Sequence, residues 1–228
     1  MTQDTAKHSN TDTDSRWGVL FDLDGVLIDS ESEYTRIWNR INEEFPTDVP
    51  NFAERIKGTT LENILMLHYP DPEVRRRVEE RLLEEESHMV YEYCPGAREL
   101  LDDLRAHGVP MALFTSSNDI KMAHLYHDLP GLRDYFNVVI TGDMVSRSKP
   151  DPEGYLKAAD ELHLASGRCV VVEDSLQGVR AGEAAGSAVL GVAGTLPAAT
   201  LAPHCGEVTS TLAGYDAARL YRLLTNRH

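Results

Sequence analysis

The sequence has too little positive charge for a typical nucleic-acid-binding protein. Its 228 residues include 22 Lys and Arg against 37 Asp and Glu, which gives a formal net charge of −15. Nucleic-acid binding depends on clustered basic side chains that displace counterions from the phosphates. An anionic membrane surface repels such a chain for the same reason. We therefore expect neither partner, although a metal ion and one or two basic groups can still create a local site for a phosphorylated metabolite.

Long apolar runs and cysteines are also scarce. No stretch approaches the roughly 18 apolar residues of a membrane helix, and the N-terminus lacks a signal-peptide pattern. The three cysteines, Cys94, Cys169 and Cys205, are odd in number and widely spaced, which fits reduced thiols better than a disulfide framework. These features favour a cytoplasmic protein, and we take a monomer as the default.

The pattern along the chain predicts a polar tail followed by a core with a helical insertion. Residues 1–15 are almost all polar and are predicted to be a disordered tail. A short apolar run that ends at Phe21 predicts the first strand. Within 31–94, apolar residues recur at helical spacing on a charged background, so this segment is predicted to be a helical domain. The core is then expected to comprise residues 16–30 and 95–228.

The second half of the chain alternates apolar runs with amphipathic segments. The runs end near Phe114, Ile140, Val172 and Val192, and a helix is expected after each of the first three. Strand–helix alternation predicts an α/β fold with a doubly wound, Rossmann-like parallel sheet that is covered on both faces. One helix is predicted to open with Asp151 as its N-cap and Pro152 at its first position.

Polar clusters follow four of the predicted strands. In a parallel sheet, the carboxyl ends of the strands meet at one edge, where ligands of this architecture bind. Each cluster alone is typical of turns and helix caps, but the four in this order indicate a site. They are Asp22 with Asp24, Thr115 to Asn118, Lys149-Pro150, and Glu173-Asp174.

The acidic members of these clusters predict a magnesium site. Asp22, Asp24, Glu173 and Asp174 would place up to four carboxylates in one crevice, where like charges cannot all stay ionised without a cation. Hard oxygen ligands suit Mg²⁺, and no cluster of His or Cys accompanies them to favour zinc. We expect Asp174 to bind the metal directly and Glu173 to act directly or through water.

These residues suggest a division of roles in phosphoryl transfer. The Asp22 carboxylate can attack phosphorus and form an aspartyl phosphate, which divides one difficult displacement into two. Asp24 can protonate the leaving oxygen and then activate water. Thr115 and the backbone N–H of Ser116 can hold the phosphoryl oxygens, while Lys149 neutralises their charge.

The ordered set resembles the haloacid dehalogenase-like hydrolase superfamily, in its phosphatase and β-phosphoglucomutase-like branch. The matching stretches are 21–31 (FDLDGVLIDSE), 112–118 (ALFTSSN), 148–153 (SKPDPE) with Tyr155, and 170–182 (VVVEDSLQGVRAG). The resemblance implies that Asp22 is the nucleophile, Asp24 the acid/base, Thr115 and Lys149 phosphate binders, and Asp174 a metal ligand. It also implies that the Asp24 backbone carbonyl is a ligand and that 31–94 is an α-helical cap.

The cap departs from the β-phosphoglucomutase pattern at two positions. That branch carries a His shortly after the first motif and an Arg beyond a Lys-Gly pair, whereas this chain has Tyr34 and Leu61. Because Leu61 cannot grip a second phosphate, we rank hydrolysis above mutase activity. We expect cap specificity from Arg55, Lys57, Gly58 and Thr59, although Arg55 and Lys57 fit a solvated charged face equally well.

Three function classes follow from these patterns. The first is Mg²⁺-dependent hydrolysis of a small-molecule phosphate ester, such as a sugar phosphate. The second is a β-phosphoglucomutase-like phosphomutase. The third is a phosphorylatable, receiver-like signalling module, which also combines acidic residues, a hydroxyl and a Lys on a parallel sheet. Receiver domains lack a helical insertion after the first strand, so the first class is favoured.

Overall fold

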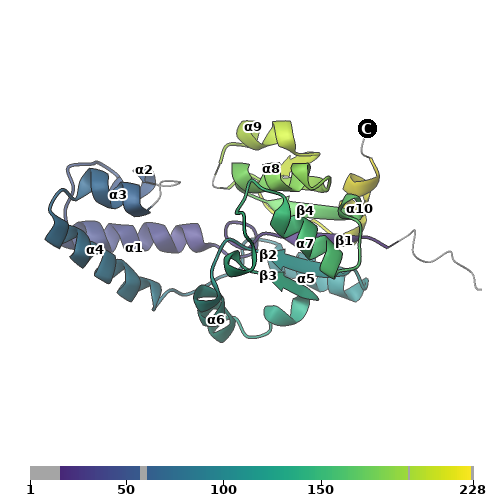
Figure 1. The fold of residues 1–228 in the computed structure, drawn as a ribbon, viewed down its shortest axis with the longest axis horizontal. Coiled ribbons are helices and arrows are strands. Elements are labelled where there is room, and N and C mark those ends of the chain that lie inside the picture. Colours follow the sequence, from purple (N-terminus) through teal and green to yellow (C-terminus); the bar gives the residue numbers. More distant parts are fainter. Residues whose placement is uncertain (1–15, 57–60, 195, 227–228) are drawn as a thin grey trace, which may run out of the picture.

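The computed structural model describes residues 16–56, 61–194 and 196–226. The predicted tail 1–15 and the predicted cap residues Lys57, Gly58 and Thr59 lie outside the described residues. The described chain forms a parallel sheet with helices on both faces and a separate group of helices beside it (Figure 1).

Six parallel strands form the sheet. They are β1 (Gly18–Phe21), β2 (Met111–Phe114), β3 (Val138–Ile140), β4 (Cys169–Glu173), β5 (Ala188–Val192) and β6 (Glu207–Thr209). Their order across the sheet is β3-β2-β1-β4-β5-β6, the order of a Rossmann-type doubly wound fold. Val19 pairs with Met111 on one side and Val170 on the other. The predicted α/β class is therefore confirmed.

The strands are short apolar runs because both faces of the sheet are buried. Every residue of β1, β2, β4 and β5 is buried. Successive side chains of a strand point to opposite faces, so Phe21 belongs to one core cluster and Leu20 to the other. Such continuous apolar runs are typical of parallel sheets covered on both sides.

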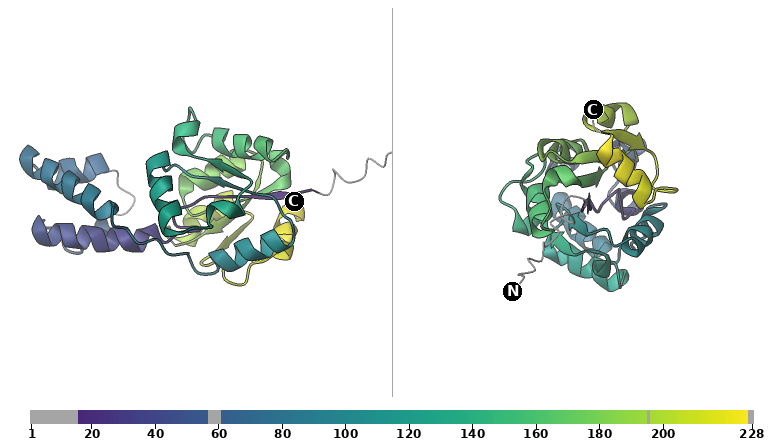
Figure 2. Two further views of the ribbon diagram at one scale, coloured as in Figure 1. Left: turned by 90° about the horizontal axis from the view of Figure 1, so that it is seen from below. Right: turned by 90° about the vertical axis from the view of Figure 1, so that its right-hand side faces the viewer.

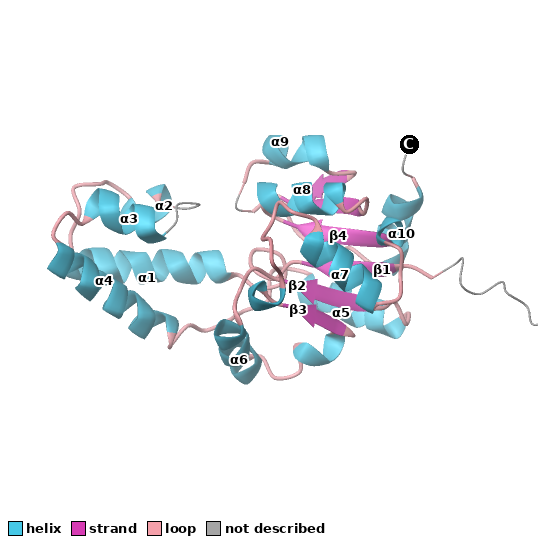
Figure 3. Cartoon of the chain, viewed as in Figure 1, coloured by secondary structure: helices cyan, strands magenta, loops and turns pink. Residues whose placement is uncertain are grey.

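Helices cover the two faces of the sheet (Figure 3). The helices of this core are α5 (Ala97–Ala106), α6 (Asp119–Asp128), α7 (Glu153–Glu161), α8 (Leu176–Ala184), α9 (Ala198–Leu201) and α10 (Ala217–Thr225), with single turns η1 (Arg133–Tyr135), η2 (Gly142–Met144), η3 (Ser166–Arg168) and η4 (Ala202–His204). Leu100 of α5 and Leu220 of α10 pack in the cluster of Phe21. Ala158 of α7 and Val179 of α8 pack on the opposite face, with Leu20.

The insertion between β1 and α5 is helical, as predicted. Its helices are α1 (Ser30–Glu44), α2 (Phe52–Arg55), α3 (Leu61–His68) and α4 (Pro72–Glu86). They extend away from the sheet as a separate group, and the carboxyl ends of the strands face them (Figures 2 and 3). Trp38 and Phe52 pack edge to face within this group. The limits 31–94 for this domain stay a prediction.

The start of α7 corrects one detail of the sequence interpretation. Asp151 was expected as the N-cap, but the N-cap is Pro152 and the helix begins at Glu153. The Asp151 carboxylate accepts a hydrogen bond of 3.0 Å from the Glu153 N–H. Asp151 thus still satisfies a backbone donor at the helix start, but from the position before the N-cap, because the helix begins one residue later than predicted.

Candidate active site

The acidic residues lie where the strand order reverses. Asp22 follows β1 directly, Glu173 ends β4 and Asp174 follows it. β1 and β4 are neighbours in the sheet, while the chain leaves β1 toward β2 on its other side. The point between β1 and β4 is therefore the topological switch point, where open α/β sheets bind their ligands.

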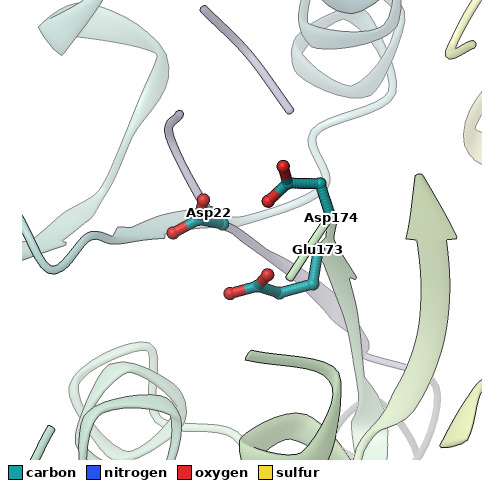
Figure 4. Close-up of side chains that lie close together, drawn as sticks. All are labelled: Asp22, Glu173 and Asp174. Atoms are coloured by element: carbon teal, nitrogen blue, oxygen red, sulfur yellow. The ribbon is translucent and has the colours of Figure 1, made fainter. Parts of the chain in front are cut away.

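Three carboxylates converge at this point (Figure 4). Asp22, Glu173 and Asp174 each offer an oxygen atom, and these atoms all lie within 4.8 Å of one another. All three residues are buried, and Glu173 is fully so. Carboxylates this close need a compensating cation, because each raises the free energy of ionising the next.

Lys149 supplies part of that compensation. Its ammonium lies 2.5 Å from Asp22 Oδ1 and 2.5 Å from Glu173 Oε1. Burial alone would lower the pKa of Lys149, but the charges of Asp22 and Glu173 outweigh it and raise the pKa overall. Lys149 is therefore a fixed positive charge beside Asp22.

The remaining charge of the cluster fits a divalent cation. Three carboxylates and one ammonium carry a formal charge of −2 when all are ionised. Burial raises the pKa of Asp22 well above its usual value; Lys149 opposes that rise, while Glu173 and Asp174 add to it. A hard cation such as Mg²⁺, held by Asp22 and Asp174, would neutralise the excess with the oxygen ligands that it prefers.

Asp24 lies outside this cluster and has its own partner. Both of its carboxylate oxygens accept hydrogen bonds of 2.8 Å from Lys121 Nζ, and Ser117 Oγ donates to Oδ2 at 3.1 Å. Burial would raise the pKa of Asp24, but Lys121 and the hydrogen bonds lower it overall. The Asp24 side chain is thus not among the clustered oxygens of the described residues. A role for its backbone carbonyl as a ligand stays a prediction.

The predicted phosphate binders line the same cavity. Thr115 and Ser116 follow β2, and with Asp22, Asp24 and Lys149 they line a cavity of about 610 Å³. The buried Thr115 hydroxyl accepts a hydrogen bond from the Ser117 N–H at 3.0 Å. That bond orders the loop after β2, so residues 115–117 present their polar groups toward Asp22's cavity.

A comparison with models of protein families gives a match, which spans most of the fold and all four motifs. Residues 18–186 match the model of the haloacid dehalogenase-like hydrolases, which covers β1, the helical insertion, β2, β3, β4 and α8. The chain belongs to the haloacid dehalogenase-like hydrolase family. The resemblance drawn from the four motifs is therefore confirmed.

Several members of this family with assigned functions are similar over most of the chain. A "Phosphorylated carbohydrates phosphatase" of Thermotoga maritima is 33% identical over 74% of this chain and 81% of its own length. "Hexitol phosphatase A" of Escherichia coli is 34% identical over 86% of this chain and 89% of its own length.

Solved structures of the family share the fold. A haloacid dehalogenase family hydrolase of Deinococcus radiodurans, with bound phosphate and sodium, matches with a TM-score of 0.78 and 29% identity over 92% of this chain and 97% of its own. A putative β-phosphoglucomutase of Thermotoga maritima matches with a TM-score of 0.71 and 28% identity over the same shares of the two chains.

The cap residues are only partly described. Arg55 is exposed at the end of α2. Tyr34, which stands where the mutase-like branch has a His, donates a hydrogen bond of 3.0 Å to Glu86. Leu61 lines an apolar cavity of about 270 Å³ between the cap helices, together with Trp38. The assignment of cap specificity to Arg55, Lys57, Gly58 and Thr59 stays a prediction.

Two neighbours of the predicted site residues were missed from the sequence. Lys121 lies in the first turns of the amphipathic α6, where a Lys usually faces solvent, and 97 residues separate it from Asp24. Tyr155 lies within the matched motif, but nothing in the sequence shows that its hydroxyl bonds Glu173.

In the described part of the chain, each helix is too short or too polar to traverse a lipid bilayer.

Proposed function

We propose that this chain is a Mg²⁺-dependent phosphatase that hydrolyses a small-molecule phosphate ester through an aspartyl-phosphate intermediate on Asp22. The convergence of Asp22, Asp174 and Lys149 at the sheet's switch point carries this proposal. All three residues line one cavity, which supports the roles of nucleophile for Asp22, metal ligand for Asp174 and positive charge for Lys149. The four motifs and the family membership support the same reaction class.

Asp22 forms the covalent bond of the first step. One of its oxygens attacks the phosphorus atom, an O–P bond forms, and the bond from phosphorus to the leaving oxygen breaks. Lys149 donates a hydrogen bond to Oδ1 of this carboxylate and can contact the phosphoryl oxygens as their charge shifts. Asp22 and Asp174 would hold Mg²⁺, which would supply charge neutralisation for the phosphoryl group.

Asp24 moves the proton in both steps. Its protonated form gives the proton to the leaving oxygen, and the resulting carboxylate takes a proton from the water that attacks the aspartyl phosphate. Phosphate then leaves and Asp22 is regenerated. In the present arrangement Lys121 and Ser117 hold Asp24 in its ionised form, so Asp24 must take up a proton and separate from Lys121 before the first step.

Thr115, Ser116 and Lys149 would hold the phosphoryl oxygens. Thr115 and Ser116 line the cavity beside Asp22, and a pair of donors from one loop suits the three equatorial oxygens of a transferring phosphoryl group. Glu173 fits a ligand role less well, because four donors already occupy its two oxygens: Lys149, Tyr155, and the N–H and hydroxyl of Ser175.

A phosphorylated carbohydrate or polyol is the proposed substrate. The similar proteins of Thermotoga maritima and Escherichia coli are named for phosphorylated carbohydrates and hexitol. A second cavity of about 500 Å³ adjoins the phosphate loop at Ser116 and Ser117 and is lined by Tyr91 and His124 among others. Its hydroxyl, amide and ring groups suit a polyhydroxylated leaving group.

Phosphomutase activity is the second candidate. The structural similarity to a putative β-phosphoglucomutase supports it. Two positions argue against it. Leu61 stands for the Arg that grips the second phosphate in that branch, and Tyr34 stands for the His that helps gate the acid/base residue. A receiver-like signalling module is disfavoured by the helical insertion after β1 and by the family match.

A metabolite panel with product identification tests this proposal. Purified protein is incubated with Mg²⁺ and a set of sugar, polyol and nucleoside phosphates, and both inorganic phosphate and isomerised esters are measured. We expect phosphate release from at least one carbohydrate phosphate and none from the Asp22→Asn variant. Isomerisation faster than phosphate release would establish the mutase instead, and full activity of Asp22→Asn would refute the assigned nucleophile.

A further inference from the structure

The ammonium of Lys149 lies in a box of two aromatic rings and two carboxylates. Lys149 Nζ is 4.8 Å from the centre of the Phe114 ring and 5.3 Å from that of Tyr155. The two rings meet edge to face, with their centres 4.9 Å apart. Asp22 and Glu173 close the remaining sides. Both rings are buried, so this box excludes water from one side of the ammonium.

Tyr155 also bonds the carboxylate that anchors Lys149. Its hydroxyl donates to Glu173 Oε1 at 3.0 Å, and the same oxygen accepts from Lys149. Glu173 Oε2 accepts from the N–H and hydroxyl of Ser175. The backbone of α8 closes the far side, because a Cβ built on Gly178 would lie only 1.7 Å from Glu173 Oε1. Both carboxylate oxygens of Glu173 are therefore held by hydrogen bonds, and the backbone of α8 at Gly178 limits how far the carboxylate can move.

We propose that Tyr155 is a positioning residue for the phosphate site, which acts through Glu173 to hold the Lys149 ammonium against Asp22. The inference rests on the proposed function, because it assigns Lys149 to the phosphoryl oxygens. Lys has a long, flexible stem, and an ammonium is a point charge that many geometries could satisfy. The Tyr155 hydroxyl limits Glu173 Oε1 to one position, and Glu173 then limits Lys149.

This assignment separates Glu173 from the metal. A carboxylate accepts about four hydrogen bonds, and the four donors already present occupy Glu173 fully. Loss of the Tyr155 hydroxyl should therefore weaken the binding of phosphate and leave the binding of Mg²⁺ to Asp22 and Asp174 unchanged. A purely structural role for Tyr155 in the core predicts neither effect.

The test is Tyr155→Phe, which keeps the ring and removes only the hydroxyl. The affinity for inorganic phosphate in the presence of Mg²⁺ is measured by calorimetry, and the half-saturating Mg²⁺ concentration is measured from turnover and from direct metal titration. We expect phosphate affinity to fall about tenfold, the scale of losing one hydrogen bond to a charged group, with metal affinity unchanged. An unchanged phosphate affinity, or an equal loss of metal affinity, would overturn the assignment.

Tyr135→Phe is the matched control. The Tyr135 hydroxyl also donates to a carboxylate, that of Asp102, at 2.6 Å. Tyr135 lies in η1, before the amino end of β3 and hence at the edge of the sheet opposite Asp22. This variant should lose stability without any change in phosphate affinity. Equal losses of phosphate affinity in the two variants would show a general effect and overturn the proposal.

A second variant covers the case in which Tyr155→Phe does not fold. Glu173→Gln keeps the shape of the side chain through which Tyr155 acts and removes its charge, and it should weaken phosphate binding while sparing Mg²⁺ binding. Wild-type phosphate affinity in folded Glu173→Gln would show that Glu173 does not hold Lys149 for phosphate and would overturn the proposal. Because inorganic phosphate is the probe, this test remains decisive even if the wild-type protein hydrolyses no ester, which would instead refute the proposed function.

Discussion

Replacing Gly25 by Ala tests whether the turn after β1 shapes the metal site. Gly25 has a φ of +76°, and a Cβ built there would lie 2.1 Å from Asp174 Oδ2. This distance is far below contact, so the Asp174 carboxylate must move if the backbone stays in place. The substitution should therefore disturb a proposed metal ligand, Asp174, from a residue that has no side chain to bind the metal itself.

Gly25→Ala should have two effects, a loss of stability and a loss of Mg²⁺ affinity, and a matched variant separates them. A non-glycine residue in the left-handed region costs about 1–2 kcal/mol of stability. Gly186 has a φ of +78°, and no described atom lies within 4 Å of a Cβ built there. Gly186→Ala should thus show the backbone cost alone. Gly25→Ala should add a loss of about 10–100-fold in Mg²⁺ affinity, the range found when support for a metal ligand is removed.

Urea unfolding without metal and turnover as a function of Mg²⁺ concentration measure the two effects. Both variants should unfold more easily than the wild type, while only Gly25→Ala should need more Mg²⁺ for half-maximal turnover. If the two variants show the same Mg²⁺ dependence, the steric link between Gly25 and Asp174 is refuted. A normal Mg²⁺ dependence in both would also count against Asp174 as a ligand.

Three further predictions concern charges and helix ends. Lys149→Met should destabilise the metal-free protein at pH 7 by about 3–5 kcal/mol, because Asp22 and Glu173 lose their buried partner. The pKa of Asp22, already raised, should rise further, so the loss of stability in urea unfolding should shrink as the pH falls and Asp22 protonates; a loss independent of pH would contradict this prediction. Lys121→Met removes the charge that lowers the pKa of Asp24, so the variant should be less stable than the wild type at pH 7. This difference in stability should shrink as the pH falls below about 4 and disappear below the lowered pKa of Asp24, where Asp24 is protonated; a difference that grows toward acid would refute this pairing. Asp71 is the N-cap of α4, and its carboxylate accepts a hydrogen bond of 2.8 Å from the Glu73 N–H. Asp71→Ala should lower the free energy of unfolding in urea by about 1 kcal/mol and leave turnover at saturating Mg²⁺ unchanged. Altered turnover would show that the start of α4 is coupled to the active site.

The sequence was sufficient to predict the sheet and the acidic cluster, except that it also expected the Asp24 carboxylate in that cluster. β1 is apolar throughout, and β4 is apolar up to Val172, because both faces of a parallel sheet are buried; an acidic residue follows each of these two runs. Asp22, Glu173 and Asp174 could be expected together since carboxyl ends of neighbouring strands meet at one edge. The local pattern of an apolar run followed by an acidic residue was therefore enough to predict where these side chains lie.

Contacts between distant loops and helices could not be predicted in the same way. Lys121 meets Asp24 only because α6 packs beside the turn after β1, and a Lys on an amphipathic helix has no sequence mark of a buried partner. Lys149 also contacts Glu173, and Tyr155 shares that oxygen, although 18 residues separate the Tyr from the Glu. These pairings depend on side-chain directions that periodicity does not encode.

The most direct test of the central claim is a search for the phosphorylated residue. The protein is mixed with a substrate found in the metabolite panel, labelled in its phosphate group, in the presence of Mg²⁺, and the reaction is stopped in acid within milliseconds. Peptide mapping should then place the label on the peptide that contains Asp22, and the label should be absent without Mg²⁺ and in Asp22→Asn. Label on another residue, or rapid turnover with no label on Asp22 at any time, would contradict the account.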